Sequence, residues 1–159
     1  SEARARQGLG PLPGRRPSTG ETAPAPEQPG PAAEPLSLLT AAAHHFVTSS
    51  FGNQTGLLDR ERAPFLEIHP ADAAARQIRD GDLVIIENER GWCKLQAVVS
   101  DAVRPGVIAS PKGRWAKLDP FRNGAGGRNV NWTTSDELAD MAGQSTFHSN
   151  RVWVRRVED

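Results

Sequence analysis

The stretch from residue 65 to residue 91 constrains the fold most, because short apolar runs and turn signals follow one another within it. It begins with an apolar strand, after which Pro70 stands where a first helical residue would lie. Asp72 falls in the first turn of that helix, where an acid offsets the positive end of the helix dipole. Asp80-Gly81 predicts the end of the helix, and Leu83–Ile86 then predicts a strand that is buried on both faces.

Several further short strands are predicted outside this stretch. Residues 92–100 alternate apolar and polar side chains, which predicts a strand with one buried face, and Cys93 lies on that face as a small core residue. Strands are also predicted at 35–40, 107–110 and 151–155. Ser135 precedes two acids and predicts the N-cap of a short helix. Many short strands with only small helices favour a barrel over a sandwich.

The composition excludes several classes of protein. The 159 residues suit one domain, and equal numbers of basic and acidic residues leave a formal net charge of zero. A general nucleic-acid-binding or membrane-surface protein would show a basic excess, so neither kind of partner is expected. No run approaches the ~20 apolar residues of a membrane-spanning helix. Cys93 is the single cysteine, which excludes an internal disulfide and a cysteine cage for zinc or an iron–sulfur cluster within this chain.

Residues 1–35 differ in composition from the rest of the chain. They hold most of its thirteen prolines and show no apolar periodicity, which indicates a linker or surface-wrapping segment. We therefore expect a linker at 1–35 and the folded domain at 36–159. Because residue 1 is Ser and not Met, we expect that an N-terminal part has been removed. For location we favour the cytoplasm, with the periplasm as the alternative if a targeting signal was removed with that part.

A polar loop follows the strand predicted at 35–40. Its polar side chains are those of His44, His45, Thr48, Ser49, Ser50 and Asn53. Hydroxyls, imidazoles, an amide and backbone N–H groups are the donors and acceptors that a fused heterocycle and a pyrophosphate require. A loop that caps its own backbone with Ser and Thr has the same composition. The residue types alone leave both interpretations open.

The histidines do not indicate a metal site. His44 and His45 are adjacent, and neighbours on a strand point to opposite faces. None of the four histidines has the spacing of a zinc signature, so no metal ligand is predicted. The basic, glycine-rich loop at 111–128 also lacks the residue order of a phosphate-binding loop, although long loops in compact domains are usually functional. A histidine that hydrogen-bonds a ligand is the better interpretation.

Three segments, in this order along the chain, together resemble one family. They are LLTAAAHHFVTSSFGNQ at 38–54, HPADAAARQIRDGDLVIIENERG at 69–91 followed by VRPGV at 103–107, and NWTT at 131–134 with STFH at 145–148. This set resembles the C-terminal molybdopterin-dinucleotide-binding domain of the molybdopterin oxidoreductases, the superfamily of dimethyl sulfoxide reductase and formate dehydrogenase. The resemblance covers residues 36–157 and implies a mostly β fold, a six-stranded double-psi β-barrel with short helices.

The resemblance implies that the domain binds and orients a molybdenum or tungsten bis(molybdopterin guanine dinucleotide) cofactor that it shares with the rest of an enzyme. The positions implied to contact the cofactor are Thr40, Ala41, His44, His45, Phe46, Thr48, Ser49, Ser50, Asn53, Asn131 and His148. His148 departs from the lysine that the family often has there.

No catalytic residue and no metal ligand is implied in this chain, because the family's metal ligand and its iron–sulfur cysteines lie in an earlier domain. We therefore expect the isolated chain to be inactive, as one part of a molybdopterin-dependent oxidoreductase. Its partners are then the remaining domains or the catalytic subunit of that enzyme.

Two other interpretations belong to different classes of protein. Double-psi barrels also serve as protein-binding modules, so a standalone interaction domain or accessory subunit is the alternative. A self-sufficient enzyme that uses His44, His45 and Asp72 rests only on the proximity of these residues in the sequence. The polar loop within 38–53 favours cofactor binding, because a recognition module does not need it.

Overall fold

Six strands close into a barrel, and each carries buried side chains at alternate positions. The computed structural model describes residues 34–48, 50–115, 118, 126–139 and 143–157. The barrel strands are β1 (Leu36–Ala42), β2 (Phe65–Ile68), β3 (Leu83–Asn88), β4 (Gly91–Val99), β5 (Val107–Lys112) and β7 (Arg151–Arg156). Each corresponds to a strand predicted from the sequence. A further short strand, β6 (Gly126–Gly127), pairs with β4 outside the closed ring.

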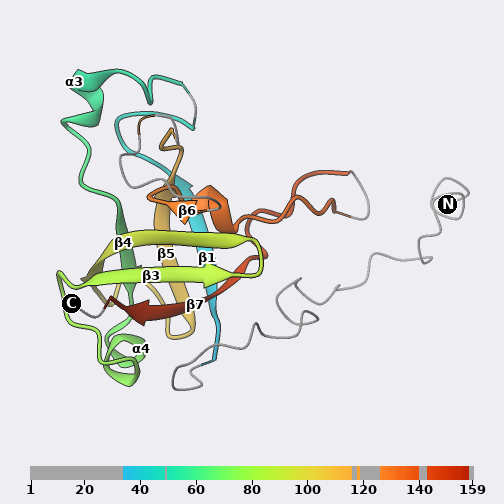
Figure 1. Cartoon of the computed structure of the whole chain (residues 1–159). Helices are drawn as coiled ribbons and strands as arrows, with labels where there is room; N and C mark the ends of the chain where they lie inside the picture. Colours follow the sequence, from blue (N-terminus) through green and yellow to red (C-terminus); the bar gives the residue numbers. More distant parts are fainter. Residues whose placement is uncertain (1–33, 49, 116–117, 119–125, 140–142, 158–159) are drawn as a thin grey trace, which may run out of the picture.

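The order of the strands closes the sheet on itself (Figure 1). Around the barrel the strands run β2, β5, β1, β7, β3 and β4, and β4 pairs again with β2. The β1–β5 and β2–β4 pairs are parallel, whereas the other pairs of the ring are antiparallel. Parallel strands require crossover connections, and two of them give the double-psi arrangement. The predicted fold, a mostly β six-stranded barrel with short helices, is confirmed.

The inward-facing side chains form one apolar core. Its fully buried members are Leu38, Leu66, Ile68, Val84, Ile86, Cys93, Ile108 and Val152, and Leu95 is 1% exposed. Cys93 is therefore the small core residue that the alternation predicts. Leu83, in contrast, is 43% exposed, so β3 is buried on one face and not on both. The reason is that the outer face of a barrel strand meets solvent unless another layer covers it.

The helix α4 (Pro70–Ala75) begins as predicted but ends earlier. His69 is its N-cap, with Nδ1 accepting a hydrogen bond from Ala71 N at 3.2 Å, and Asp72 lies in the first turn. Ile78 N donates to Ala73 O, and Gln77, whose φ is +56°, donates to Ala74 O, which is a Schellman motif. The helix thus stops several residues before Asp80-Gly81, because this motif turns Ile78 into the core.

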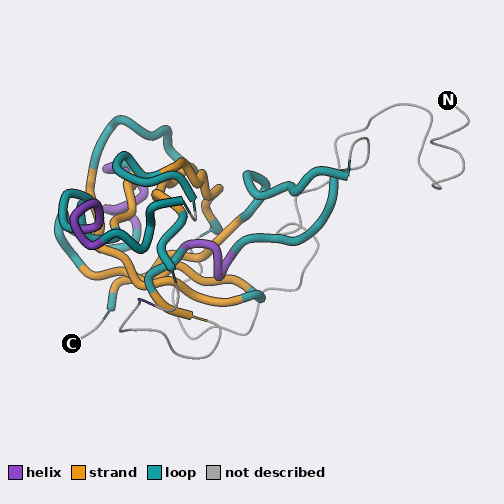
Figure 2. Tube along the Cα trace, turned by 90° about the horizontal axis from the view of Figure 1, so that it is seen from above, coloured by secondary structure: helices purple, strands orange, loops and turns teal. Residues whose placement is uncertain are grey.

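The prediction of a short helix that begins at Ser135 is wrong. Ser135 Oγ does accept a hydrogen bond from Glu137 N at 3.0 Å, as an N-cap would, but the chain then extends. Leu138 pairs with Ser145 in an antiparallel bridge, and the segments on either side of residues 140–142 extend away from the barrel (Figure 2). Ser135 N donates to the buried Asn150 side chain at 2.9 Å, and this tertiary bond helps to direct the segment away from a helical turn.

Two short helices mark opposite ends of the barrel (Figure 1). One end carries α3 (Thr55–Leu58) and is called the α3 end below, and the other carries α4 and is called the α4 end. Apart from residues 34–35, the predicted linker lies outside the described residues. Arg76 and Arg151 donate to the backbone carbonyls of Glu34 and Pro35 at 2.7 and 2.6 Å. None of the helices in the described part of the chain is long and apolar enough to cross a membrane.

Candidate functional site

The polar loop predicted from the sequence leaves β1 at the α3 end of the barrel (Figure 1). Within it, Val47 and Ser50 exchange two backbone hydrogen bonds of 3.2 and 2.8 Å, which makes a tight turn. Thr48 and Phe51 have φ values of +48° and +65°. Non-glycine residues adopt this left-handed region at a cost, and such residues gather at functional sites. We call residues 43–53 the site loop.

Neighbouring segments hold the site loop in place. His45 N donates to Glu61 Oε2 at 3.0 Å, which joins the start of the loop to the segment after α3. A Cβ atom added to Gly113 would lie 2.6 Å from Thr48 O, so the chain after β5 approaches the turn closely. A Cβ added to Gly52 would lie 3.2 Å from Trp115 Nε1. The loop therefore contacts both the segment after α3 and the segment after β5.

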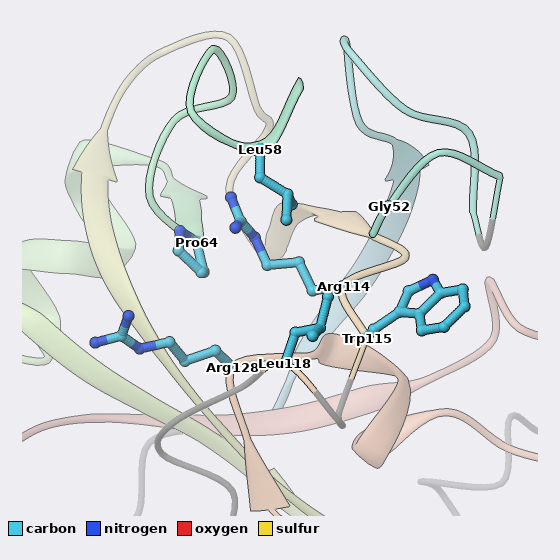
Figure 3. A pocket seen from close by; sticks show the side chains of 7 residues that line it. All are labelled: Gly52, Leu58, Pro64, Arg114, Trp115, Leu118 and Arg128. Atoms are coloured by element: carbon cyan, nitrogen blue, oxygen red, sulfur yellow. The ribbon is translucent and has the colours of Figure 1, made fainter. Parts of the chain in front are cut away.

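A pocket of about 110 Å³ lies beside the site loop. Its lining residues are Gly52, Leu58, Pro64, Arg114, Trp115, Leu118 and Arg128 (Figure 3). Leu58 and Arg114 approach each other across the pocket, while the Trp115 ring lies beside Gly52. Asn129 Nδ2 donates to Arg114 O at 2.5 Å, which connects this side of the pocket to the segment that carries Asn131. Much of the basic loop predicted at 111–128 falls outside the described residues.

Asn131 lies on the one-turn helix η2 (Val130–Thr133), which packs against β4 and β5. Its side chain is exposed, and its backbone N–H donates to Asn129 Oδ1 at 3.1 Å. Beside it, Trp132 Nε1 and Thr134 Oγ1 are buried and have no hydrogen-bond partner among the described residues. A buried polar group without a partner is uncommon and calls for an explanation. Sequence reasoning missed these two groups, although both belong to the NWTT segment that contains Asn131.

Two buried amide side chains fasten η2 and the segment after it to the barrel. Asn88 Nδ2 donates to Thr133 O at 2.8 Å. Asn150, 1% exposed, accepts from Ser135 N at 2.9 Å and donates to Phe147 O at 2.8 Å. These bonds tie together the segments that lie before and after the Leu138–Ser145 bridge. Asn131 is thereby held in a defined position although it lies outside the strands.

His148 lies close to the end of β5. Its ring is 4.2 Å from the ring of Phe147, and Lys112 Nζ lies 3.9 Å from the centre of the Phe147 ring. Lys112 pairs in register with Ala42 at the end of β1, immediately before the site loop. The Phe147–His148 pair therefore lies near the end of β5, whose last residue is in register with the residue before the site loop.

The predicted contact residues differ in accessibility. Those exposed are Ala41, His44, Thr48, Ser50, Asn53, Asn131 and His148, whereas His45 is half-buried. Thr40 and Phe46 are each 2% exposed, and Thr40 pairs with Ser110 inside the barrel. Ser49 lies outside the described residues. In this conformation Thr40 and Phe46 offer almost no surface to a ligand, so we assign them to support of the loop.

The accessible groups are hydroxyls, imidazoles and amides, which donate and accept hydrogen bonds and fit a polar heterocycle. His44 and His45 lie edge to face, with ring centroids 4.7 Å apart. Among the described residues, no group of three His, Cys, Asp or Glu side chains could hold a metal ion. The arrangement can thus recognise a ligand by hydrogen bonds.

Comparison with known proteins gives consistent matches. The model of the family described as "Molydopterin dinucleotide binding domain" matches residues 36–151. The probable oxidoreductase YoaE of Bacillus subtilis is 40% identical over 114 residues, which are 72% of this chain and 16% of that protein. Dimethyl sulfoxide reductase DmsA of Escherichia coli is 34% identical over 111 residues, 70% of this chain and 13% of that protein.

A solved structure shows the same fold. Acetylene hydratase from Pelobacter acetylenicus superposes with a TM-score of 0.64 and 22% identity, over 77% of this chain and 18% of that chain. This chain therefore spans less than a fifth of the length of each of these relatives. Because the family model extends over most of the described barrel, from residue 36 to residue 151, the chain belongs to the molydopterin dinucleotide binding domain family.

Proposed function

We propose that the α3 end of the barrel binds a molybdenum bis(molybdopterin guanine dinucleotide) cofactor within a longer molybdopterin oxidoreductase, of which this domain is the C-terminal part. The observation that carries the proposal is the pair of buried, unpartnered polar groups beside Asn131, Trp132 Nε1 and Thr134 Oγ1. A ligand rich in donors and acceptors would supply the partners that the described residues lack, once the side chains that cover these two groups move aside. The relatives that share this domain support the oxidoreductase assignment.

The residues of this chain would bind and orient the cofactor. The exposed amide of Asn131 and the polar groups of the site loop suit the donors and acceptors of a pterin ring. When bound, the metal supplies the redox or hydration chemistry, and tungsten on the same pterin would meet the same residues. The other predicted contacts that the structure describes (Thr40, Ala41, His44, His45, Phe46, Thr48, Ser50, Asn53 and His148) surround or support this face in the proposal, and Ser49 stays a predicted contact.

The chain would work together with other domains. Cys93 is the single cysteine and is buried in the core, so the metal ligand and any iron–sulfur cysteines would come from the remainder of the enzyme. The partners are therefore the remaining domains or a catalytic subunit. We expect the isolated chain to show no turnover, because it would supply only part of the binding shell.

The first experiment tests the unpartnered hydroxyl. Thr134→Val keeps the shape of the side chain and removes the hydroxyl. In the isolated chain the variant should be as stable as the parent, or more stable, because a buried group without a partner costs about 1–3 kcal/mol. In the longer enzyme the same variant should lower molybdenum content at limiting cofactor, by about 5-fold or more. Elemental analysis and thermal unfolding measure the two effects.

His45→Ala and Asn131→Ala in the longer enzyme should lower molybdenum content in the same way. Asp72→Ala, at the opposite end of the barrel, is the control and should keep the cofactor. If Asp72→Ala strips the cofactor while the other three variants retain it fully, the binding face is wrong. A barrel that serves only as an interaction module would keep full metal content in all four variants.

A further inference from the structure

Two residues outside the predicted contact set hold the site loop from two neighbouring segments. The first is Glu61, whose Oε2 accepts a hydrogen bond of 3.0 Å from His45 N. Its own backbone N–H donates to Leu57 O and Leu58 O, both at 3.2 Å, so the carboxylate is attached to the last turn of α3. Glu61 is half-buried, as is His45. A charged acceptor makes a stronger bond to a backbone N–H than a neutral one does.

The second residue is Gly113, immediately after β5. Its φ is +102°, and an added Cβ would lie 2.6 Å from Thr48 O and 2.8 Å from Thr48 Cα. Atoms cannot approach so closely, so any side chain here would push the turn at Thr48 away. Thr48 itself has a left-handed φ of +48°. The glycine therefore allows the chain after β5 to contact the strained turn.

We propose that Glu61 and Gly113 are positioning residues that preset the site loop for the cofactor without contacting it. The inference rests on the proposed function of this loop. A loop that is ordered before binding loses less conformational entropy when the ligand arrives, so affinity rises without any new contact. Glu61 holds the start of the loop through His45, and Gly113 accommodates its turn through Thr48.

The Glu61 contribution is tested by removing and then restoring the acceptor. Glu61→Ala should speed hydrogen exchange of the His45 amide in this chain by about tenfold, and should lower molybdenum content of the longer enzyme at limiting cofactor by about fivefold. Glu61→Gln keeps an acceptor oxygen and should restore most of both. Glu87→Ala is the matched control, because Glu87 is bonded to Arg155 on the barrel wall at 2.9 Å. It should change neither the exchange of His45 nor the metal content.

The Gly113 contribution is tested against a second glycine of similar backbone. Gly113→Ala and Gly81→Ala both place a side chain at positive φ, at +102° and +84°, but nothing lies within 4 Å of a Cβ at Gly81. Both variants should lower the unfolding temperature. Only Gly113→Ala should speed amide exchange around Thr48 and lower molybdenum content.

The outcomes separate the two proposals. The positioning role is wrong if Glu61→Ala leaves hydrogen exchange at His45 unchanged. It is also wrong if Glu61→Ala and Gly113→Ala loosen the loop but keep full metal content. In either case the proposed function stands as long as Thr134→Val and Asn131→Ala lose metal. If Thr134→Val and Asn131→Ala also keep full metal content, the proposed function is wrong and the positioning role falls with it. Loss of metal in both sets, with rescue by Glu61→Gln, supports both.

Discussion

The two ends of the barrel satisfy their backbone in different ways. At the α4 end, aspartate side chains accept hydrogen bonds from backbone N–H groups. Asp72 Oδ2 accepts from Gly106 N at 2.7 Å, Asp80 Oδ1 from Val99 N at 2.9 Å, and Asp82 Oδ2 from Arg79 N at 2.8 Å. Carboxylates that accept backbone N–H groups make strong hydrogen bonds. These turns need no further partner.

At the α3 end, not every buried polar group has a hydrogen-bond partner among the described residues. Trp132 Nε1 and Thr134 Oγ1 are buried without partners, and the site loop holds two non-glycine residues at positive φ. Phe51 is also 64% exposed, although it is a large apolar side chain. Strain, unpaired polar groups and exposed apolar surface are features that gather at binding faces, so they support the function proposed for this end.

Apparent exceptions at the α4 end have local explanations. Gln77 has a φ of +56°, but it lies at the position after a helix end where a left-handed residue closes a Schellman motif. Arg76 Nε is buried without a partner, yet the other two nitrogens of that guanidinium donate to Asp72 O and Glu34 O. The α4 end thus pairs its own polar groups, whereas the α3 end leaves some without partners among the described residues, and this difference supports the binding role proposed for the α3 end.

The largest expected effect is at Asn150, which holds the α3-end segments from within. Asn150→Ala removes the bonds to Ser135 N and Phe147 O and leaves both groups buried or half-buried. We expect a loss of about 2–4 kcal/mol in the free energy of unfolding, measured by urea denaturation. His148→Ala, which changes an exposed side chain nearby, should stay within about 0.5 kcal/mol of the parent. If Asn150→Ala loses less unfolding free energy than His148→Ala, other contacts order this end.

The next effect concerns Asp72 at the α4 end. A helix-dipole contribution alone predicts a loss of about 0.3–1 kcal/mol for Asp72→Ala. The structure adds the 2.7 Å bond to Gly106 N and a 3.7 Å ion pair with Arg76, so we expect about 1.5–2.5 kcal/mol in thermal unfolding. Asp72→Asn, which keeps an acceptor, should lose less. Molybdenum content should stay unchanged in both variants, and a parallel loss of metal would remove the distinction between the two ends.

The smallest effect compares strain at the two ends. Gln77→Gly and Thr48→Gly each place glycine at a positive φ, which should raise stability by about 0.5–1 kcal/mol. At Gln77 the metal content should not change. At Thr48 the added backbone freedom in the site loop should lower metal content by about threefold. Equal behaviour of the two variants in cofactor retention would mean that Thr48 strain has no part in binding.

The sequence predicted the barrel strands well because their signal is local. Alternation of apolar and polar side chains predicts which face of residues 92–100 is buried, and the structure buries Cys93, Leu95 and Ala97 there. The start of α4 was also predictable, because Pro70 and Asp72 act within one turn. The order of the motifs was sufficient to indicate the family that the comparisons confirm.

Part of the candidate site was not predictable from residue types. Thr40 and Phe46 belong to the segment that resembles the family's contact loop, but their burial depends on strand register and loop packing. Glu61 is in a stretch with no motif, and its role depends on a contact with His45, sixteen residues earlier. Gly113 is informative only because Thr48 lies against it.

The sequence by itself determined the strands, the start of α4 and the position of the polar loop, since periodicity and capping act between residues a few positions apart. Tertiary structure alone decided where α4 ends, that Ser135 starts an extended segment, and which polar groups are left without partners. The helix ends where Ile78 enters the core. Asn150, fifteen residues away from Ser135, accepts a hydrogen bond from the Ser135 N–H. Such outcomes depend on which distant groups the closed barrel brings within hydrogen-bond distance, and no local pattern contains that information.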